Sequence, residues 1–217
     1  MTPILLVLSS PSGGGKTTIA RNLKQGREDV GYSVSATTRA PRPGERDGVD
    51  YHYLTKDEFL RRVTAGDFLE YATYNGHLYG TLRVEIERIL SDGRHAVLDI
   101  EINGARQVRA AFPDAILVFV LPPSARVLAA RLAHRGTEDP ARLRQRLALA
   151  AEELRAVPEY DYAVVNDDLF AAVASVAAVL DAESRRVSRH PALPELVDQL
   201  QREIAAEAAR LPSQARA

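Results

Sequence analysis

The residues best suited to chemistry lie between positions 10 and 18, in the run Ser-Pro-Ser-Gly-Gly-Gly-Lys-Thr-Thr. Its three consecutive glycines let backbone N–H groups turn toward one point, and the helix expected after them adds the positive end of its dipole. A di- or triphosphate is the ligand that suits such a loop. Lys16 would reach the terminal phosphates, and the hydroxyl of Thr17 would hold Mg²⁺.

The common form of this loop is G-x-x-x-x-G-K-[ST], and here Ser10 replaces the first glycine. A small residue can still make the entry turn, so we interpret the change as a modification of the loop. The alternative is a glycine-rich turn that only caps a helix, but the strand expected before it and the helix after it favour a phosphate site. The predicted phosphate-binding loop comprises Ser10, Pro11, Ser12, Gly13, Gly14, Gly15, Lys16, Thr17 and Thr18.

Two acidic residues, Asp99 and Glu101, follow a second apolar run. Residues 96–100 predict a buried strand, and open α/β sheets bind ligands at the carboxyl ends of such strands. An acid there can position Mg²⁺, so Asp99 is a candidate metal ligand together with Thr17. The alternative is a carboxylate that only caps the next helix. Glu101 would point to the same side of the strand, where it could touch a second substrate.

A candidate site for that second substrate begins with Arg39 and Arg42, in a loop stiffened by prolines. Guanidinium groups held in this way suit a phosphate monoester, although arginine-bearing loops are often only solvated surface. Glu70 lies in an apolar and aromatic segment, where an unpaired carboxylate is costly. Guanine offers two parallel N–H donors to a carboxylate, whereas adenine has an acceptor at N1. The hydroxyls of Ser35 and Thr81 could complete this edge.

The elements that must position these residues alternate in type, which predicts an α/β fold with a mainly parallel five-stranded sheet. Glycines, prolines and helix caps set their limits. Strands are expected at 4–8, 96–100, 116–121 and 162–165, a hairpin at 68–81 with its turn at 75–76, and helices at 16–26, 55–65, 82–91, 104–111, 124–136, from 139 onward and at 168–186. Residues 33–81 are rich in tyrosine and turn residues and predict an inserted β-rich lobe.

Composition limits the remaining classes of protein. At 217 residues with a net charge of −1, the chain predicts one domain without the basic field that nucleic acid or an anionic membrane would attract. It contains no cysteine, which excludes a disulfide framework and a zinc-thiolate site and makes the cytoplasm the expected location. No run approaches the roughly 20 apolar residues of a membrane helix. The oligomeric state stays open.

The tail from Pro194 carries an amphipathic stripe of Leu196, Val197, Leu200, Ile204, Ala208 and Leu211. A stripe of this kind predicts a helix that buries one side. We expect it to pack on its own domain, and the alternative is a contact with another chain.

In order and spacing, residues 3–186 resemble the guanylate kinase family. The motifs that carry the resemblance are SPSGGGKT from residue 10, YSVSATTRAPRPGE from 32, GVDY from 48, FLEY from 68, LYGT from 78, LDIE from 98, RGTE from 135 and VNDD from 165. Two positions depart from the commonest pattern: Ser10, and Glu101 where aspartate is frequent. Neither change removes a charge, so they bear on nucleotide affinity rather than on the reaction type.

The resemblance implies transfer of a phosphoryl group from ATP, with Mg²⁺, to GMP, giving ADP and GDP in purine nucleotide metabolism and GMP recycling. It implies a GMP pocket, a mobile lid at 125–146 and an adenine contact from Asn166. The GMP pocket would comprise Ser35, Arg39, Arg42, Glu45, Tyr51, Glu70, Tyr79, Thr81, Asp99 and Glu101. Arg39, Arg42, Tyr51 and Tyr79 would hold the GMP phosphate, and the catalytic set would be Lys16, Arg39, Arg42, Arg131, Arg135 and Arg146.

By the same resemblance, residues 1–186 form the kinase domain, with its core at 1–32, 82–124 and 147–186, its GMP-binding lobe at 33–81 and its lid at 125–146. Residues 187–217 form a helical extension. Two other readings share this fold: a scaffold domain that binds phosphopeptides, and a kinase of a phosphorylated sugar. The scaffold domains typically lack an intact phosphate loop, and a sugar kinase would not need Glu70 to face a base.

Overall fold

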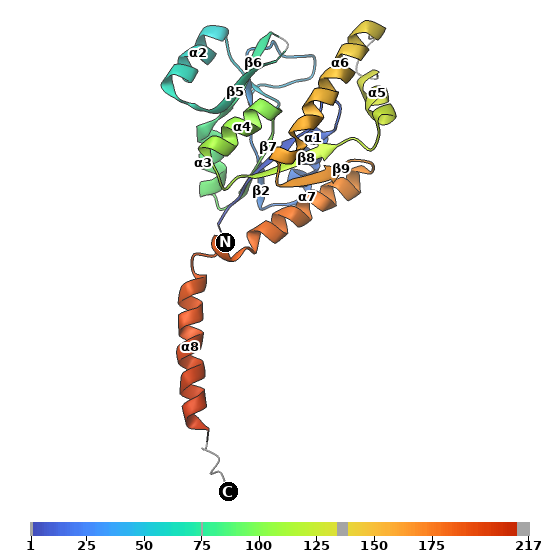
Figure 1. Cartoon of the computed structure of the whole chain (residues 1–217). Coiled ribbons are helices and arrows are strands. Elements are labelled where there is room, and N and C mark those ends of the chain that lie inside the picture. Colours follow the sequence, from blue (N-terminus) through green and yellow to red (C-terminus); the bar gives the residue numbers. More distant parts are fainter. Residues whose placement is uncertain (1, 75, 134–138, 212–217) are drawn as a thin grey trace.

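The structure is a computed structural model and describes residues 2–74, 76–133 and 139–211. Its centre is a parallel sheet with the strand order β2-β7-β1-β8-β9 (Figure 1). The strands are β1 (Leu5–Ser9), β2 (Val30–Tyr32), β7 (His95–Asp99), β8 (Ile116–Leu121) and β9 (Tyr162–Val165). The predicted five-stranded sheet is confirmed. In its register Leu8 pairs with Asp99, so the phosphate loop after β1 begins beside that carboxylate.

Helices cover both faces of this sheet. They are needed there because the side chains of β1 point alternately to the two faces and are apolar on both. They are α1 (Lys16–Gly26) and α7 (Leu169–Ser184) on one face, and α3 (Arg83–Ser91) and α4 (Ile102–Ala111) on the other. Ile4, Leu6 and Leu8 pack into the α1/α7 core, whereas Leu5 and Val7 pack into the α3/α4 core. A strand buried on both faces is apolar at each position, which is why residues 4–8 form a continuous apolar run.

The predicted lobe contains a second, mixed sheet with the order β4-β3-β6-β5. Its elements are β3 (Ala36–Thr37), β4 (His52–Tyr53), β5 (Phe68–Tyr74), β6 (His77–Leu82) and the helix α2 (Lys56–Ala65). The side chain of Thr55 accepts a hydrogen bond from the N–H of Glu58, which confirms the predicted helix start. β5 and β6 pair antiparallel, so the hairpin is confirmed, while Asn75 of its turn lies outside the described residues.

A β-bulge interrupts β5 at Leu69. Phe68 pairs with Leu82 and Glu70 pairs with Thr81, so one residue of β5 is left over. Phe68 stacks on Phe59 inside the lobe, with ring centroids 4.3 Å apart. Leu69 and Glu70, although adjacent in sequence, both face α4. The bulge thereby turns the Glu70 carboxylate out of the lobe core and toward the sheet.

The predicted lid corresponds to α5 (Ala125–Ala133) and the first part of α6 (Pro140–Glu153), which η1 (Leu154–Glu159) continues. Asp139 accepts a hydrogen bond from the N–H of Ala141 at 3.3 Å and so caps α6 as expected. The two helices share a small apolar core of Leu128, Leu132, Leu143, Leu147 and Ala150. Arg135 and the helix end predicted at Gly136 lie outside the described residues.

After α7 the chain passes through η2 (Val187–Arg189) into α8 (Leu193–Arg210). Figure 1 shows α8 pointing away from the body, and every residue of Pro194–Arg210 is exposed. The expectation that this helix packs on its own domain is therefore wrong.

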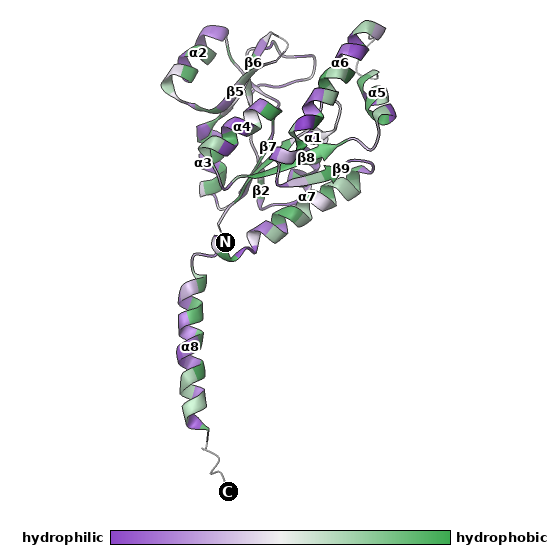
Figure 2. Ribbon diagram, viewed as in Figure 1, coloured by the Kyte–Doolittle hydropathy of each residue, from purple (hydrophilic) through white to green (hydrophobic). Residues whose placement is uncertain are grey.

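The physical reason lies in the body surface where the chain leaves it. That surface carries ion pairs, such as Arg109 with Asp161 and Arg186 with Glu183, and charged groups of this kind do not favour the burial of an apolar stripe. In Figure 2 apolar positions recur along α8 among polar ones. None of the described helices combines the length and apolarity that crossing a membrane requires.

Candidate active site

The phosphate loop joins β1 to α1 through a turn that needs glycine. Gly13 and Gly15 have φ angles of 84° and 99°, in the left-handed region that favours glycine. The N–H of Gly14 donates to the carbonyl of Pro11 over 2.9 Å. Gly15 is the N-cap of α1 and makes no side-chain cap, so the first N–H groups of the helix are left for an anion. The loop therefore presents N–H donors at the place where a phosphate is predicted to bind, and the phosphate site itself stays a prediction.

Side chains from distant elements contact each part of this loop. The amide of Asn166 donates to the carbonyl of Gly14 over 2.8 Å, and a Cβ at Gly15 would lie only 2.3 Å from the same nitrogen. Leu132 of α5 lies against Gly13, where an added Cβ would meet it at 3.0 Å. Arg146 of α6 donates to the Ser12 hydroxyl over 3.0 Å. The loop is thus held between the lid helices and the end of β9.

The serine in place of the first glycine fits its position. Ser10 is buried, and its hydroxyl donates to the carbonyl of Pro11 over 2.9 Å. A Cβ on Gly14 would lie 2.7 Å from the Ser10 Cβ, so the two residues pack against each other. Ser10 therefore takes part in the turn without displacing it.

Asp99 and Thr17 face each other across the carboxyl edge of the sheet. The Thr17 hydroxyl donates to Asp99 Oδ2, and the Tyr32 hydroxyl donates to Oδ1 over 2.6 Å. Oxygen donors of this kind suit Mg²⁺, which keeps several waters and binds substrate phosphates besides one or two protein ligands. Among the described residues there is no group of three or more His, Cys, Asp or Glu side chains that could hold a metal. The oxygen atoms of Thr17 and Asp99 therefore fit a magnesium ion whose other ligands come largely from a nucleotide and from water.

The predicted phosphate-monoester residues lie together at one side of the lobe. The Arg39 guanidinium lies 5.3 Å from the ring centroid of Tyr51 and 5.9 Å from that of Tyr53. Tyr51 and Tyr79 meet edge to face, with centroids 5.9 Å apart. These aromatic faces hold a planar cation in one place. The side chain of Arg42 is exposed on the loop beside them.

Glu45 holds this cluster in place. Both of its oxygens accept from Arg39 Nη2 at 2.9 Å, and Oε2 also accepts from the Arg42 N–H and the Tyr53 hydroxyl. Burial acts to raise the pKa of Glu45, but these hydrogen bonds outweigh it and lower the pKa to about 2. The side chain is thus anionic at neutral pH and acts as a clamp on Arg39. Sequence reasoning did not single out Tyr53.

Glu70, on β5 of the same lobe, is buried. Its Oε1 accepts from the Thr81 hydroxyl over 2.7 Å, and a Cβ added at Gly104 would lie 2.4 Å from Oε2. Burial raises the pKa of Glu70 to about 7; the bond from Thr81 opposes this shift and the nearby charge of Glu101 adds to it. Glu101 carries a buried oxygen that has no hydrogen-bond partner among the described residues. The carboxyl groups of Glu70 and Glu101 could thus accept hydrogen bonds from a ligand that has several N–H donors.

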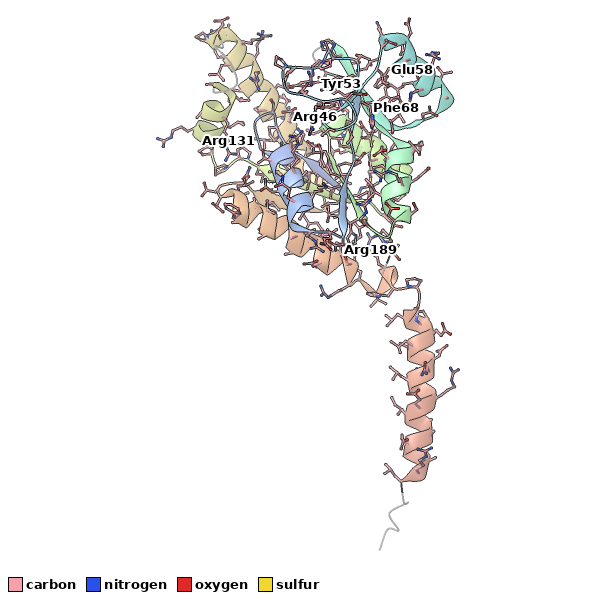
Figure 3. All side chains as sticks on the ribbon, turned by 180° about the vertical axis from the view of Figure 1, so that it is seen from behind. Arg46, Tyr53, Glu58, Phe68, Arg131 and Arg189 are labelled. Carbon is pink, nitrogen blue, oxygen red and sulfur yellow. The ribbon has the colours of Figure 1, made fainter. Side chains whose placement is uncertain are left out.

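Two of the three arginines expected in the lid contact the phosphate loop and its neighbours. Arg131 donates to the carbonyl of Asn166 over 3.0 Å, and Arg146 contacts Ser12. Figure 3 shows Arg131 on the lid and Tyr53 and Arg46 on the lobe, on two sides of the end of α1 that carries the phosphate loop. The third predicted lid arginine, Arg135, is outside the described residues.

A carboxylate that sequence reasoning missed also faces the loop. Glu153, near the end of α6, is half-buried beside Lys16 and Ser12. Burial raises its pKa, while Lys16 and the Ser12 N–H act against that shift. It lies two helical turns after Arg146, so the same face of α6 carries both residues.

This combination of a phosphate loop, a second lobe with a buried acid and an arginine-bearing helical pair can be compared with known proteins. The family model described as Guanylate kinase matches residues 2–183. The chain belongs to the guanylate kinase family. The guanylate kinase of Symbiobacterium thermophilum is 48% identical over 189 residues, or 87% of this chain and 90% of that protein. That of a Thermus thermophilus strain is 46% identical over 204 residues, or 94% of this chain and 91% of that protein.

A solved structure supports the same assignment. The guanylate kinase from Anaplasma phagocytophilum matches with a TM-score of 0.76 at 33% identity, over 91% of this chain and 95% of that chain. In this guanylate kinase fold, Ser35 lies between β2 and β3, where its carbonyl accepts from the His52 N–H at 2.9 Å. Those predicted site residues that the structure describes lie on two surfaces, one around the phosphate loop and one in the lobe, and Asp99 and Glu101 lie between them.

Proposed function

We propose that the protein transfers the γ-phosphoryl group of ATP to GMP, giving ADP and GDP. The observation that carries this proposal is the buried Glu70. It lies in a lobe inserted after β2 of the parallel sheet, and the phosphate loop follows β1 of the same sheet. A scaffold domain would not need Lys16 and Thr17 at the start of α1. A sugar kinase would not need a buried carboxyl group bonded to Thr81 in the second site.

ATP is proposed to bind with its phosphates at residues 10–18, under the lid at 125–146, and with its adenine near Asn166. Lys16 would neutralise the β- and γ-phosphates. Thr17 and Asp99 would hold Mg²⁺, which would neutralise negative charge on the phosphates of the nucleotide. The contacts of Leu132 and Arg146 with the loop support a lid that covers this site.

GMP is proposed to bind in the lobe at residues 33–81. Arg39, Tyr51 and Tyr79 would hold its phosphate together with Arg42, whose side chain is exposed on the same loop. Glu70 would accept from the N1–H and N2–H₂ of guanine, and Thr81 would keep its Oε1 oriented. Ser35 and Glu101 would complete the contacts to the base. Closing of the lobe and lid would exclude water, so that ATP is not hydrolysed.

No side chain is required as a general base in this mechanism. The nucleophile is an oxygen of the GMP phosphate, whose second pKa of about 6 leaves it mostly dianionic at neutral pH. The protein would place this oxygen in line with the γ-phosphorus and stabilise the charge that spreads over the transferred group. Lys16, Arg39 and the lid arginines Arg131, Arg135 and Arg146 supply positive charge for this purpose.

Substrate choice tests the proposal directly. ADP formation is measured by a coupled assay with GMP, AMP, CMP and UMP in turn, each with ATP and Mg²⁺. We expect turnover with GMP and little with the other three, because only guanine presents two adjacent N–H donors to Glu70. Equal turnover with all four, or ADP formation that does not depend on a nucleoside monophosphate, would contradict the proposal.

The affinity for GMP should depend on pH near neutrality. The pKa of Glu70 in the free protein is about 7, and only the ionised carboxylate can accept both guanine N–H groups. As pH falls below 7, kcat/KM for GMP should therefore fall by up to about tenfold per unit, and it should level off above 7. Turnover at saturating GMP should stay nearly flat from about pH 7 upward, since bound guanine holds Glu70 ionised, and should fall only at lower pH, as the GMP phosphate with its pKa of about 6 becomes protonated.

The Glu70→Gln variant is the control for this pH profile. With this variant the GMP phosphate still titrates, with its pKa of about 6, but the carboxyl group of Glu70 is absent. A step near pH 7 that survives in Glu70→Gln would show that another group titrates there.

A further inference from the structure

The hydroxyl of Tyr32 lies against the carboxylate expected to help hold the metal. Tyr32 is the last residue of β2, which pairs with β7 so that Tyr32 is opposite Val97. Its side chain reaches two residues further along β7 and donates to Asp99 Oδ1 over 2.6 Å. A hydrogen bond from a neutral hydroxyl to a carboxylate at this distance is among the stronger ones in proteins.

This bond fixes an orientation that Thr17 alone would leave loose. The terminal torsion of an aspartate side chain has a broad energy profile, so one hydrogen bond does not determine it. Here Thr17 donates to Oδ2 and Tyr32 to Oδ1, and the two bonds together fix the plane of the carboxylate. If the Thr17 hydroxyl turns to a nucleotide-bound cation, the bond from Tyr32 is the one of the two that remains.

A second layer lies behind the tyrosine. The Arg21 guanidinium is beside the Tyr32 hydroxyl and pairs with Asp50 of the lobe at 3.2 Å. Asp50 in turn accepts from the Arg46 N–H over 2.9 Å. Arg21 follows Thr17 by four residues on α1, so both lie on one side of that helix. Because half of the Arg21 side chain is exposed, this ion pair is a weak support.

We infer that Tyr32 is a positioning residue, which holds the Asp99 carboxylate toward Thr17 and thereby toward the magnesium ion of the bound nucleotide. The inference rests on the proposed function, since it takes the Mg²⁺-nucleotide site at Thr17 and Asp99 from there. Tyr32 itself touches neither nucleotide in this assignment. Its role is to keep the Asp99 carboxylate in the orientation in which Thr17 and the cation can use it.

The test is the Tyr32→Phe variant, which removes only the hydroxyl. Calorimetry measures the affinity for ADP with and without Mg²⁺, and steady-state kinetics measure kcat at several concentrations of free Mg²⁺. We expect the affinity for metal-free ADP and the KM for GMP to be unchanged. The enhancement of ADP binding by Mg²⁺, and kcat, should fall by about 10- to 100-fold, as when the outer partner of a metal ligand is removed.

Tyr162→Phe is the matched control. Tyr162 also donates to a carboxylate, Glu183 Oε1 at 2.5 Å, but this pair joins β9 to α7 away from Asp99. We expect it to lower the melting temperature about as much as Tyr32→Phe while leaving the Mg²⁺ enhancement intact. An unchanged Mg²⁺ enhancement in Tyr32→Phe would overturn the inference, as would an equal loss in Tyr162→Phe.

A double mutant shows whether Tyr32 acts through Asp99. In an Asp99→Asn background, Tyr32→Phe should have little further effect on the Mg²⁺ enhancement, because the two changes disable the same group. If Tyr32→Phe reduces the Mg²⁺ enhancement by the same factor in the Asp99→Asn background as in the parent protein, the inference is overturned. If the parent protein turns over GMP and Tyr32→Phe behaves like the parent, only this inference fails. If the parent does not phosphorylate GMP, the proposed function fails instead.

Discussion

Lys16→Ala should lower turnover by about 10²- to 10³-fold, the loss typical of removing one preorganised charge that stabilises a transition state. The lysine is the first residue of α1, next to the glycine whose φ of 99° turns the loop. Its ammonium would face the phosphates of ATP, where negative charge is concentrated during transfer. The affinity for GMP should not change, since GMP is proposed to bind in the lobe.

The measurement compares kcat from the coupled assay with the GMP dissociation constant from calorimetry. Lys24→Ala is the control, because Lys24 lies in the last turn of the same helix and is exposed. A loss of GMP affinity as large as the loss of turnover would contradict the assignment of the two nucleotides to separate surfaces. So would a Lys24→Ala variant that is equally impaired.

Glu70→Gln should reduce the preference for GMP over AMP by about 1 to 3 kcal/mol, as expected when a buried acceptor is replaced by a donor. One oxygen of Glu70 already accepts from Thr81. An amide can present only one carbonyl oxygen, so its NH₂ group would confront one of the two guanine N–H groups, whereas the Thr81 hydroxyl can accept as well as donate. AMP, whose N1 is an acceptor, should gain relative to GMP.

The ratio of kcat/KM for GMP and AMP measures this preference. Glu183→Gln is a matched control, because Glu183 is also a buried acid, 4% exposed like Glu70, that accepts from a hydroxyl. It should lower stability and leave base preference unchanged. An unchanged GMP preference in Glu70→Gln, with the fold intact by circular dichroism, would mean that Glu70 does not recognise the base.

The elements that the sequence predicted best have strong local signals. The strands at 116–121 and 162–165 match β8 and β9, and the helix from Lys16 to Gly26 matches α1. Prolines, glycines and capping side chains act within a few residues, so their effects can be predicted without the fold. The helix starts at Thr55 and Asp139 were predicted for the same reason.

The residues that sequence reasoning missed depend on contacts between distant segments. Tyr32 had no expected role in the site, and only the pairing of β2 with β7 brings its hydroxyl to Asp99. Gly104 begins the helix predicted at 104–111, and the sequence gives no sign that it leaves the space that Glu70 Oε2 fills. Tyr53 and Glu153 likewise gain their partners only after folding. The apolar stripe from Leu196 predicted α8 as a helix, but it gave no information on the body surface, from which α8 points away.

The bulge at Leu69 has a consequence for how this protein can change over generations. In a regular strand, Phe68 and Glu70 would share a face, and the carboxyl group would enter the apolar core around Phe59. The extra residue lets Leu69 and Glu70 both reach α4. Substitutions in β5 alter one contact at a time, whereas a gain or loss of one codon there exchanges the two faces of the strand. We therefore expect natural variants of this segment to differ in residue type but to keep its length.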